Sequence, residues 1–188
     1  MFDKASTALV VIDLQKGIAS IPAEPYPASF VIGNAANLAQ AFRQNQMLVV
    51  LVRVTPSADG KDGLKPMNDS KTQMNFPRTP DWAEIVPELG LQPTDIVITK
   101  RQWGAFYGTE LDLQLRRRKI ETIVLCGIST NIGVESTARF AYEYGYQQVF
   151  VEDACAARSK DEHEHTVKTV FPRIGRVRST REVLADLE

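Results

Sequence analysis

The sequence predicts an α/β fold: one doubly wound, Rossmann-like parallel sheet of about six strands, with helices on both faces. Two observations carry this prediction. Short apolar runs alternate with helical patterns along the chain, and residues 122–158 contain a complete strand–turn–helix–strand unit. The length of 188 residues suits a single domain, so we expect residues 1–188 to form one unit.

The stretch from residue 122 to residue 158 shows the alternation most clearly. Residues 123–125 and 149–151 are apolar runs that predict two buried strands. Between them a helical pattern starts at Asn131 and stops at Gly145, a residue that easily adopts the left-handed conformation ending many helices. The two strands should be parallel because a helix connects them. The expected buried face of that helix consists of Val134, Ala138, Ala141 and Tyr142.

The rest of the chain supplies the other elements. We expect strands at residues 7–14, 47–54, 95–99 and 173–177. We expect helices at residues 29–44, 81–88, 160–170 and 179–187, and one that starts at Thr109. Thr109 and Asp112 have approximately the spacing of a capping box, and Ser179 or Thr180 should cap the last helix. The helix at Thr109 should cover the sheet with Leu111, Leu113 and Leu115.

One long segment, residues 55–79, has no regular pattern and is rich in Pro, Gly, Asp, Ser and Lys. A loop of this length inside a compact domain is usually functional or mobile. A lid over a site and a contact between subunits both fit this composition, and the sequence leaves the two open.

Composition excludes several classes of function. A net charge of −1 gives no general attraction to nucleic acid or to an anionic membrane. The basic run 116–119 has no interleaved aromatic residues and is typical of a solvated helix end. No apolar run reaches the length of a membrane span, and residues 1–15 lack the layout of a signal peptide. Two cysteines make a poor disulfide framework, so we expect a cytoplasmic protein.

Three strand ends are expected to meet in one crevice. Asp13 ends the first strand, Lys100 follows the third, and the small-residue turn from Gly127 to Gly133 follows the fourth. Ligands bind beyond the carboxyl ends of such strands, and a helix that begins there points free N–H groups outward. A carboxylate, a cation and an N–H cradle would then face one another. Taken singly, each feature has a simpler explanation. Asp13 could cap a helix, Lys100 could be a surface charge, and the turn could be an ordinary connection between a strand and a helix.

These residues carry a family resemblance. The segments VVIDLQ (residues 10–15), KRQWGAFYGTELDLQL (residues 100–115), TIVLCGISTNIGVESTARF (residues 122–140) and VEDACAARSKDEHE (residues 151–164) resemble the isochorismatase-like, or cysteine hydrolase, family. The likeness covers nearly the whole chain and is weakest in residues 55–79. It implies a parallel sheet of strand order 3-2-1-4-5-6 with the site at the topological switch point between strands one and four. It also implies a cis peptide near Ile128–Ser129 and a homodimer or homotetramer.

The chain departs from the amidase members of that family at one position. Those members carry a nucleophilic cysteine where this chain has Gly133, with an Asp that takes the thiol proton and a Lys that supports the thiolate. Neither Cys126 nor Cys155 is an obvious replacement. We expect Cys126 to pack in the core and Cys155 to lie near the ligand edge.

True isochorismatases of the family also have glycine at that position, and they share a stretch similar to residues 159–163. They hydrolyse an enol ether, which needs no nucleophilic side chain. By this resemblance Asp13 is the general acid, with Lys100 and Gly133 completing the catalytic set. The pKa of Asp13 must then be raised by burial, because a nearby Lys100 would lower it.

Substrate-binding residues are predicted around this set. Cationic candidates for a carboxylate are Lys100, Arg101, Arg53 and Arg158. The turn residues Ser129 and Thr130 lie next to Gly133. Trp103, Phe106 and Tyr107 would form an apolar wall, although Phe106 fits the core and Trp103 an interface equally well.

No metal and no cofactor are expected. His163 and His165 are two residues apart and point in different directions on a helix. Metal-dependent relatives resembling nicotinamidase use an Asp/His/His site after the second strand, and residues 53–60 contain no histidine. The expected partner is a small-molecule substrate.

Three hypotheses follow. The first is a small-metabolite hydrolase that uses acid catalysis without a covalent intermediate. The second is a binding protein on the same fold that has lost its nucleophile. The third, an amidase with a displaced nucleophile, requires Cys155 to be reactive. The residues alone do not identify the substrate.

Overall fold

A computed structural model describes residues 3–69 and 79–188. Its centre is a sheet of order β3-β2-β1-β4-β5-β6, and every neighbouring pair of strands is parallel. The predicted fold class and strand order are therefore confirmed. The strands are β1 (Thr7–Ile12), β2 (Leu48–Val54), β3 (Ile96–Lys100), β4 (Thr122–Ile128), β5 (Gln147–Ala156) and β6 (Arg176–Arg178).

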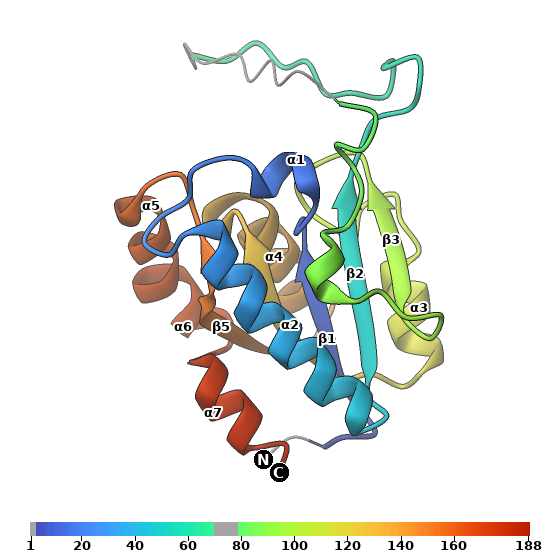
Figure 1. Ribbon diagram of the computed structural model, residues 1–188, viewed down its shortest axis with the longest axis vertical. Helices are drawn as coiled ribbons and strands as arrows, with labels where there is room; N and C mark the ends of the chain where they lie inside the picture. Colours follow the sequence, from blue (N-terminus) through green and yellow to red (C-terminus); the bar gives the residue numbers. More distant parts are fainter. Residues whose placement is uncertain (1–2, 70–78) are drawn as a thin grey trace.

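Helices cover both faces of the sheet (Figure 1). The long helix α2 crosses the near face in this view, with α7 beside it, while α3 and α4 lie behind the sheet. The strands β1, β2 and β4 are apolar and buried because helices cover both of their sides. The α-helices are α1 (Lys16–Ala19), α2 (Ala28–Gln44), α3 (Leu111–Arg117), α4 (Glu135–Glu143), α5 (Lys160–His165), α6 (Phe171–Ile174) and α7 (Thr180–Ala185).

Two helix ends behave as the sequence predicts. Gly145, at φ 81°, adopts the left-handed conformation just after α4, and its N–H bonds the carbonyl of Tyr142. Ser179 caps α7 in a reciprocal capping box with Glu182. At α3 the expected capping box is absent: the N-cap is Glu110, without a side-chain bond, and the Thr109 hydroxyl accepts from the Leu111 N–H instead.

The predicted helix at residues 81–88 is wrong. Residues 80–83 form turns, Glu84 lies in a bend, and only the short 3-10 helix η1 (Pro87–Leu89) follows. The reason is tertiary: the N–H groups of Lys16 and Gly17 bond the carbonyls of Glu84 and Trp82 at 2.9 Å each. These carbonyls are therefore engaged with α1 rather than with a helix of their own.

The predicted strand at residues 173–177 begins later, as β6. Helix α5 continues through a π-helix, η3 (Thr166–Val170), into α6, which occupies the start of the expected strand. Phe171 explains this, because it is fully buried and stacks on Phe150 of β5 with ring centroids 3.8 Å apart. That stacking keeps the helical segment against the sheet.

Two residues assigned to buried helix faces are exposed instead. Tyr142 of α4 is 56% exposed and Leu113 of α3 is 46% exposed, whereas Ala138, Ala141 and Leu115 are fully buried. On an α-helix each residue is rotated by about 100°, so Tyr142 lies at the edge of the stripe rather than within it.

The long loop leaves the body of the molecule after β2. Its described part, residues 55–69, projects beyond the ends of β2 and β3 at the top of Figure 1. The rest of the predicted loop, residues 70–78, lies outside the described residues. None of the helices in the described part of the chain is long and apolar enough to cross a membrane.

Candidate active site

Asp13 stands directly after β1, at the carboxyl edge of the sheet. Its φ of 55° is in the left-handed region that Asp visits more readily than most residues. This conformation is held on both sides, since the Asp13 N–H donates to the Val52 carbonyl at 2.9 Å and its own carbonyl accepts from the Gln15 N–H at 2.8 Å. The carboxylate held in this way lies beside Gly133, which follows β4 in the chain.

Lys100 reaches Asp13 from a distant strand. It ends β3, which is separated from β1 by β2, and its long side chain crosses the intervening strand end. Its Nζ lies 2.8 Å from Asp13 Oδ2 and also donates to the Trp103 carbonyl. The lysine is almost entirely buried, so the two charges form an ion pair shielded from water.

Burial controls the acidity of Asp13. Loss of hydration raises the pKa of this carboxyl from 3.8 to about 6, because the charged form is disfavoured in the interior, although Lys100 acts in the opposite direction. Its second oxygen, Oδ1, is buried and has no hydrogen-bond partner within residues 3–69 and 79–188. Asp13 therefore has both a raised pKa and a buried oxygen without a partner among the described residues.

Gly133 completes the arrangement. It lies in a π-helix, η2 (Thr130–Val134), between β4 and α4. A Cβ at this position would lie 2.9 Å from Asp13 Oδ2 and 3.1 Å from Lys100 Nζ. The position that the family resemblance equates with the amidase nucleophile is thus adjacent to the Asp13 carboxyl and the Lys100 ammonium group, and here it presents only main chain.

The turn before Gly133 is fixed by close packing. Gly127 has φ 130°, and a Cβ there would lie 2.0 Å from the Ile12 carbonyl oxygen, so β4 approaches β1 more closely than a side chain permits. The peptide between Ile128 and Ser129 is cis, as the resemblance implied.

Two buried hydroxyls hold η2 and α4 in place. Thr130 Oγ1 lies 2.9 Å from His163 Nδ1 of α5, and burial lowers the pKa of this histidine. Thr137 of α4 donates to the Gly133 carbonyl at 2.7 Å and accepts from the Ala105 N–H at 3.1 Å. The main chain at Gly133 is therefore tied to α5 and to the segment that follows Lys100.

A pocket of about 390 Å³ opens above these groups. It is mainly apolar, and its polar side chains include Asp13, Ser129 and two cations, Arg101 and Arg158. Arg101 is also paired with Asp62 of the long loop, its Nε 2.7 Å from Oδ2. The apolar lining comprises Ile18, Ile21, Pro22, Ala23, Val54, Pro56, Leu64, Trp82, Trp103, Ile128, Ile132 and Ala157.

The predicted site residues divide into two groups. The structure brings together Asp13, Lys100, Gly133, Ser129, Arg101 and Trp103. Thr130 is not among the residues that line the pocket, because its buried hydroxyl faces His163. Phe106 is a core residue, 4% exposed and stacked on Tyr146 at 5.7 Å, rather than part of the wall.

The other candidates also separate. Arg158 lines the pocket, whereas Arg53 does not and donates to Thr99 Oγ1 at 3.1 Å. Both cysteines are fully buried outside the lining. Burial raises the pKa of the Cys155 thiol to about 12 and that of Cys126 well above its usual range. Cys155 is thus buried beneath the ligand edge instead of facing it.

Sequence reasoning missed Trp82. This residue lies within the segment wrongly predicted as a helix, yet it is 9% exposed and lines the pocket. An isolated tryptophan after a Pro-containing loop was the available signal, but nothing in the sequence pairs it with α1.

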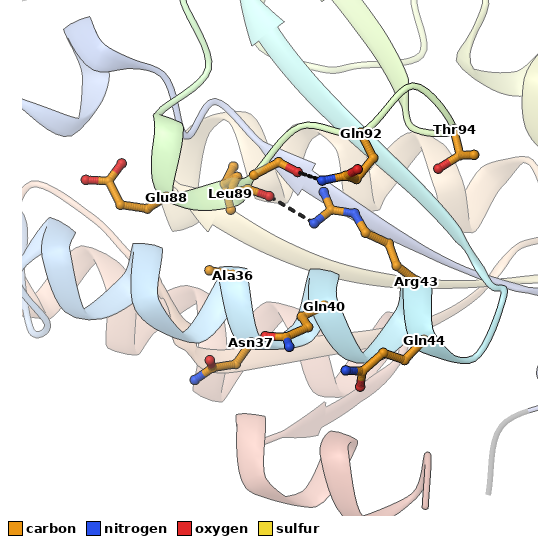
Figure 2. A pocket seen from close by; sticks show the side chains of 10 residues that line it. Ala36, Asn37, Gln40, Arg43, Gln44, Glu88, Leu89, Gln92 and Thr94 are labelled. Atoms are coloured by element: carbon orange, nitrogen blue, oxygen red, sulfur yellow. Dashed lines mark hydrogen bonds between the residues drawn. The ribbon is translucent and has the colours of Figure 1, made fainter.

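A second cavity, of about 570 Å³, lies between α2 and the segment after η1 (Figure 2). Figure 2 shows Arg43 reaching across it to the carbonyl of Leu89, a bond of 3.0 Å. Arg43 is also paired with Asp95 at 2.7 Å, so its charge is satisfied within the fold. This cavity is remote from Asp13 and shows no comparable convergence of groups. Within the described ranges, no three His, Cys, Asp or Glu residues gather as metal ligands would.

Comparison with known proteins agrees with this geometry. Residues 7–182 match the model of the isochorismatase domain family. The chain is 52% identical to an uncharacterized isochorismatase family protein, YwoC of Bacillus subtilis (strain 168), over 99% of this chain and 96% of that one. It is 34% identical to the ureidoacrylate amidohydrolase RutB of Variovorax paradoxus (strain S110), over 80% of this chain and 68% of that protein.

Solved structures show the same likeness. An isochorismatase family protein from Burkholderia thailandensis is 45% identical, with a TM-score of 0.92 over 97% of this chain and 96% of that one. N-carbamoylsarcosine amidase from Thermoplasma acidophilum is 28% identical, with a TM-score of 0.74 over 93% and 96% of the two chains. The chain belongs to the isochorismatase family of hydrolases.

Proposed function

We propose that this protein hydrolyses a small enol-ether metabolite by acid catalysis, with Asp13 as the general acid and no covalent intermediate. One observation carries the proposal: Asp13, with its pKa raised to about 6, lies beside Lys100 and beside a position that has no side chain. A general acid works best when its pKa lies near the working pH.

The reaction would run in three steps. Protonated Asp13 gives its proton to the terminal vinyl carbon, and the π-bond electrons form the new C–H bond. The adjacent carbon, which bears the ether oxygen, becomes an oxocarbenium ion. Water adds to that adjacent carbon and returns a proton to the Asp13 carboxylate. The adduct then breaks its bond to the ether oxygen, which takes the proton of the new hydroxyl, so that an alcohol and a carbonyl compound are released. The Asp13 side chain ends as it began, and one water is consumed.

Lys100 and the main chain at Gly133 would assist this sequence. The ammonium group opposes the rise in the pKa of Asp13 and stabilises the carboxylate left after proton transfer. Because Gly133 has no side chain, it presents main chain to the pocket beside Asp13. Arg101 and Arg158, both in the lining, would bind a carboxylate on the substrate.

The absence of a nucleophile argues against amide hydrolysis of the kind named for RutB and for N-carbamoylsarcosine amidase. Gly133 offers no thiol, and burial raises the pKa of both cysteine thiols. The Thr130 hydroxyl does not replace it, since it is engaged with His163 and lies outside the pocket lining.

The test is turnover of isochorismate and related enol ethers, followed by release of the carbonyl product, in the wild type and in Asp13→Asn. Turnover that depends on Asp13 supports the proposal, and equal rates remove Asp13 from the mechanism. A metabolite that binds in a thermal-shift screen and is recovered unchanged by mass spectrometry would indicate the alternative, a binding protein.

We also propose that the protein works in the cytoplasm as a homodimer or homotetramer. Both cysteines are unpaired, which suits a reducing compartment. Large apolar side chains of the loop and its neighbourhood are exposed, Leu64 by 72%, Met67 by 102% and Tyr107 by 70%. Size-exclusion chromatography with light scattering gives the mass directly, and a monomer at micromolar concentration contradicts the assembly.

A further inference from the structure

Trp82 is an aromatic lining residue to which the proposed chemistry assigns no role. It belongs to the turn that follows the long loop, and it is almost completely buried although it lines the pocket. The pocket has a second tryptophan, Trp103, which is 62% exposed. The two indoles therefore differ: one is built into the wall, and the other stands at the mouth.

Gly17 of α1 explains how the indole of Trp82 is seated. A Cβ at Gly17 would lie 2.0, 2.1 and 2.4 Å from three consecutive atoms of the five-membered ring, Cδ1, Nε1 and Cε2. Nearly equal distances to three adjacent ring atoms place that Cβ over the face of the ring and not beyond its edge. Only a residue without a side chain lets the main chain of α1 cover the indole in this way.

The turn that carries Trp82 is bonded to α1 through Trp82 itself and through residues on either side of it in the sequence. The Trp82 carbonyl accepts from the Gly17 N–H at 2.9 Å and from the amide of the buried Gln15 at 3.3 Å. Lys16 pairs with Asp81 at 2.9 Å and with Glu84 at 2.7 Å. The indole is thus held before any ligand arrives, so a ligand that packs on it loses little free energy in ordering the wall.

The chemistry around the ring indicates what it would contact. The lining is mainly apolar, with cations at Arg101 and Arg158 and the carboxyl of Asp13 at the reaction centre. A molecule suited to this pocket has a carboxylate for an arginine and an apolar body for the indole. Flat π-systems gain additional free energy on an aromatic ring through offset stacking, which a puckered saturated ring cannot match.

We propose that Trp82 is a specificity-determining residue, a preformed wall that selects carboxylates with a flat, unsaturated body over saturated ones. The inference rests on the proposed function, because it describes the substrate class of the same site. A carboxylate conjugated to an enol ether is flat around its double bond. The same molecule could therefore pack on the Trp82 indole and accept a proton from Asp13.

The first experiment uses the two-tryptophan composition of the chain. In a Trp103→Phe protein the emission comes from Trp82 alone, and benzoate and cyclohexanecarboxylate are titrated as matched flat and puckered carboxylates. We expect benzoate to bind about three- to tenfold more tightly and to change the Trp82 emission. Failure of benzoate to bind, or equal affinities for the two carboxylates, would overturn the proposal.

The second experiment removes the wall. In Trp82→Leu, and in Trp82→Phe should the leucine variant fold poorly, affinities are measured by titration calorimetry. The preference should vanish in Trp82→Leu and be partly kept in Trp82→Phe. Leu89→Ala is the matched control, because Leu89 is buried in the same segment but lies outside this pocket. A preference that survives in Trp82→Leu contradicts the proposal.

Gly17→Ala tests the seating of the ring. The added methyl collides with the indole and must displace it, so the Trp82 emission should shift and the preference for benzoate should fall. Gly33→Ala on α2 is the control, since a Cβ there meets nothing within 4 Å. An unchanged emission and preference in Gly17→Ala would show that the ring does not depend on this contact and would overturn the seating argument.

These readouts separate the two proposals. Binding preference does not require turnover, so Asp13→Asn should keep it. If the binding preference depends on Trp82 but the protein hydrolyses no enol ether, only the proposed reaction is contradicted. If the protein hydrolyses an enol ether but its preference does not depend on Trp82, only the specificity role of Trp82 is contradicted.

Discussion

Lys100 Nζ lies 2.8 Å from Asp13 Oδ2, although the two residues end strands that are not neighbours in the sheet. The pair is buried, and the burial of Asp13 outweighs the attraction of the ammonium group, so that the pKa of the carboxyl rises to about 6. A buried pair of this kind contributes little net stability, and it is better understood as a means of setting acidity.

Replacing Asp13 by Asn should remove the proton donor and keep the size of the side chain. We expect turnover of an enol ether to fall by about a hundredfold to ten-thousandfold, the usual contribution of a general acid. Substrate affinity, measured by calorimetry, should change far less. A fall in affinity as large as the fall in rate would assign Asp13 to binding instead.

The pH dependence follows from the raised pKa of Asp13. In the proposed reaction the protonated form is the active one, so the rate should be highest below pH 6 and fall about tenfold per unit well above it. The same sign applies to stability: the folded state binds the proton more tightly than the unfolded state, so stability falls as pH rises from 3.8 to about 6. Rates that increase across this range would exclude an acid role.

Lys100→Met should shift the pH dependence of the rate to higher pH. Because the ammonium group lowers the pKa of Asp13, its removal should raise this pKa further and shift the falling limb of the rate to higher pH. Lys168→Met serves as the control, since Lys168 pairs with Glu164 at 2.8 Å on the surface. A limb that stays in place would mean that Lys100 does not set the acidity of Asp13.

Gly133→Cys should create a reactive thiol. Its Cβ would stand about 3 Å from both Asp13 and Lys100, and a neighbouring cation lowers the pKa of a thiol. We expect one iodoacetamide adduct by intact-mass spectrometry in the variant and none in the native wild type, whose cysteines are buried. Alkylation of Cys155 in the native wild type would instead revive the displaced-nucleophile hypothesis.

Thr130→Val should destabilise the fold, because it removes the hydroxyl that is hydrogen-bonded to His163. His163 is 3% exposed and would lose the partner of its Nδ1, which costs about 1–3 kcal/mol of unfolding free energy. Thr7→Val is the matched control, because the buried Thr7 hydroxyl has no hydrogen-bond partner in the described chain. Denaturant unfolding compares the two, and an equal effect would contradict the importance of the Thr130–His163 contact.

The sequence was sufficient for the sheet because buried parallel strands are short apolar runs with helices between them. The edge strand β6 was harder to predict. It has only three residues and none of them is fully buried, so its position depended on the packing of Phe171. The helix predicted at residues 81–88 failed for a similar reason, since its carbonyls bond α1. Periodicity detects burial and does not detect such partners.

The sequence predicted a site residue correctly when its position at a strand end was enough to place it in the site. It failed when the direction of the side chain determined whether the residue lines the pocket. Asp13 and Gly133 follow directly from strand ends that meet at the switch point. Ser129 and Thr130 are adjacent in one turn, yet the first lines the pocket and the second faces His163. Phe106 stacks in the core because Tyr146 lies beneath it. Trp82 required knowledge of Gly17, 65 residues away, whose backbone it covers.

The sheet order divides the chain into two sets of three strands, and β1 and β4 form the seam between them. Asp13 and Lys100 belong to the first half, whereas Ser129 and Gly133 belong to the second. Neither half alone contains a complete site. The chain could be cut into two fragments at the exposed turn near Arg118. The proposed activity would return only when β1 of one fragment pairs with β4 of the other, so a measured rate would report their reassembly.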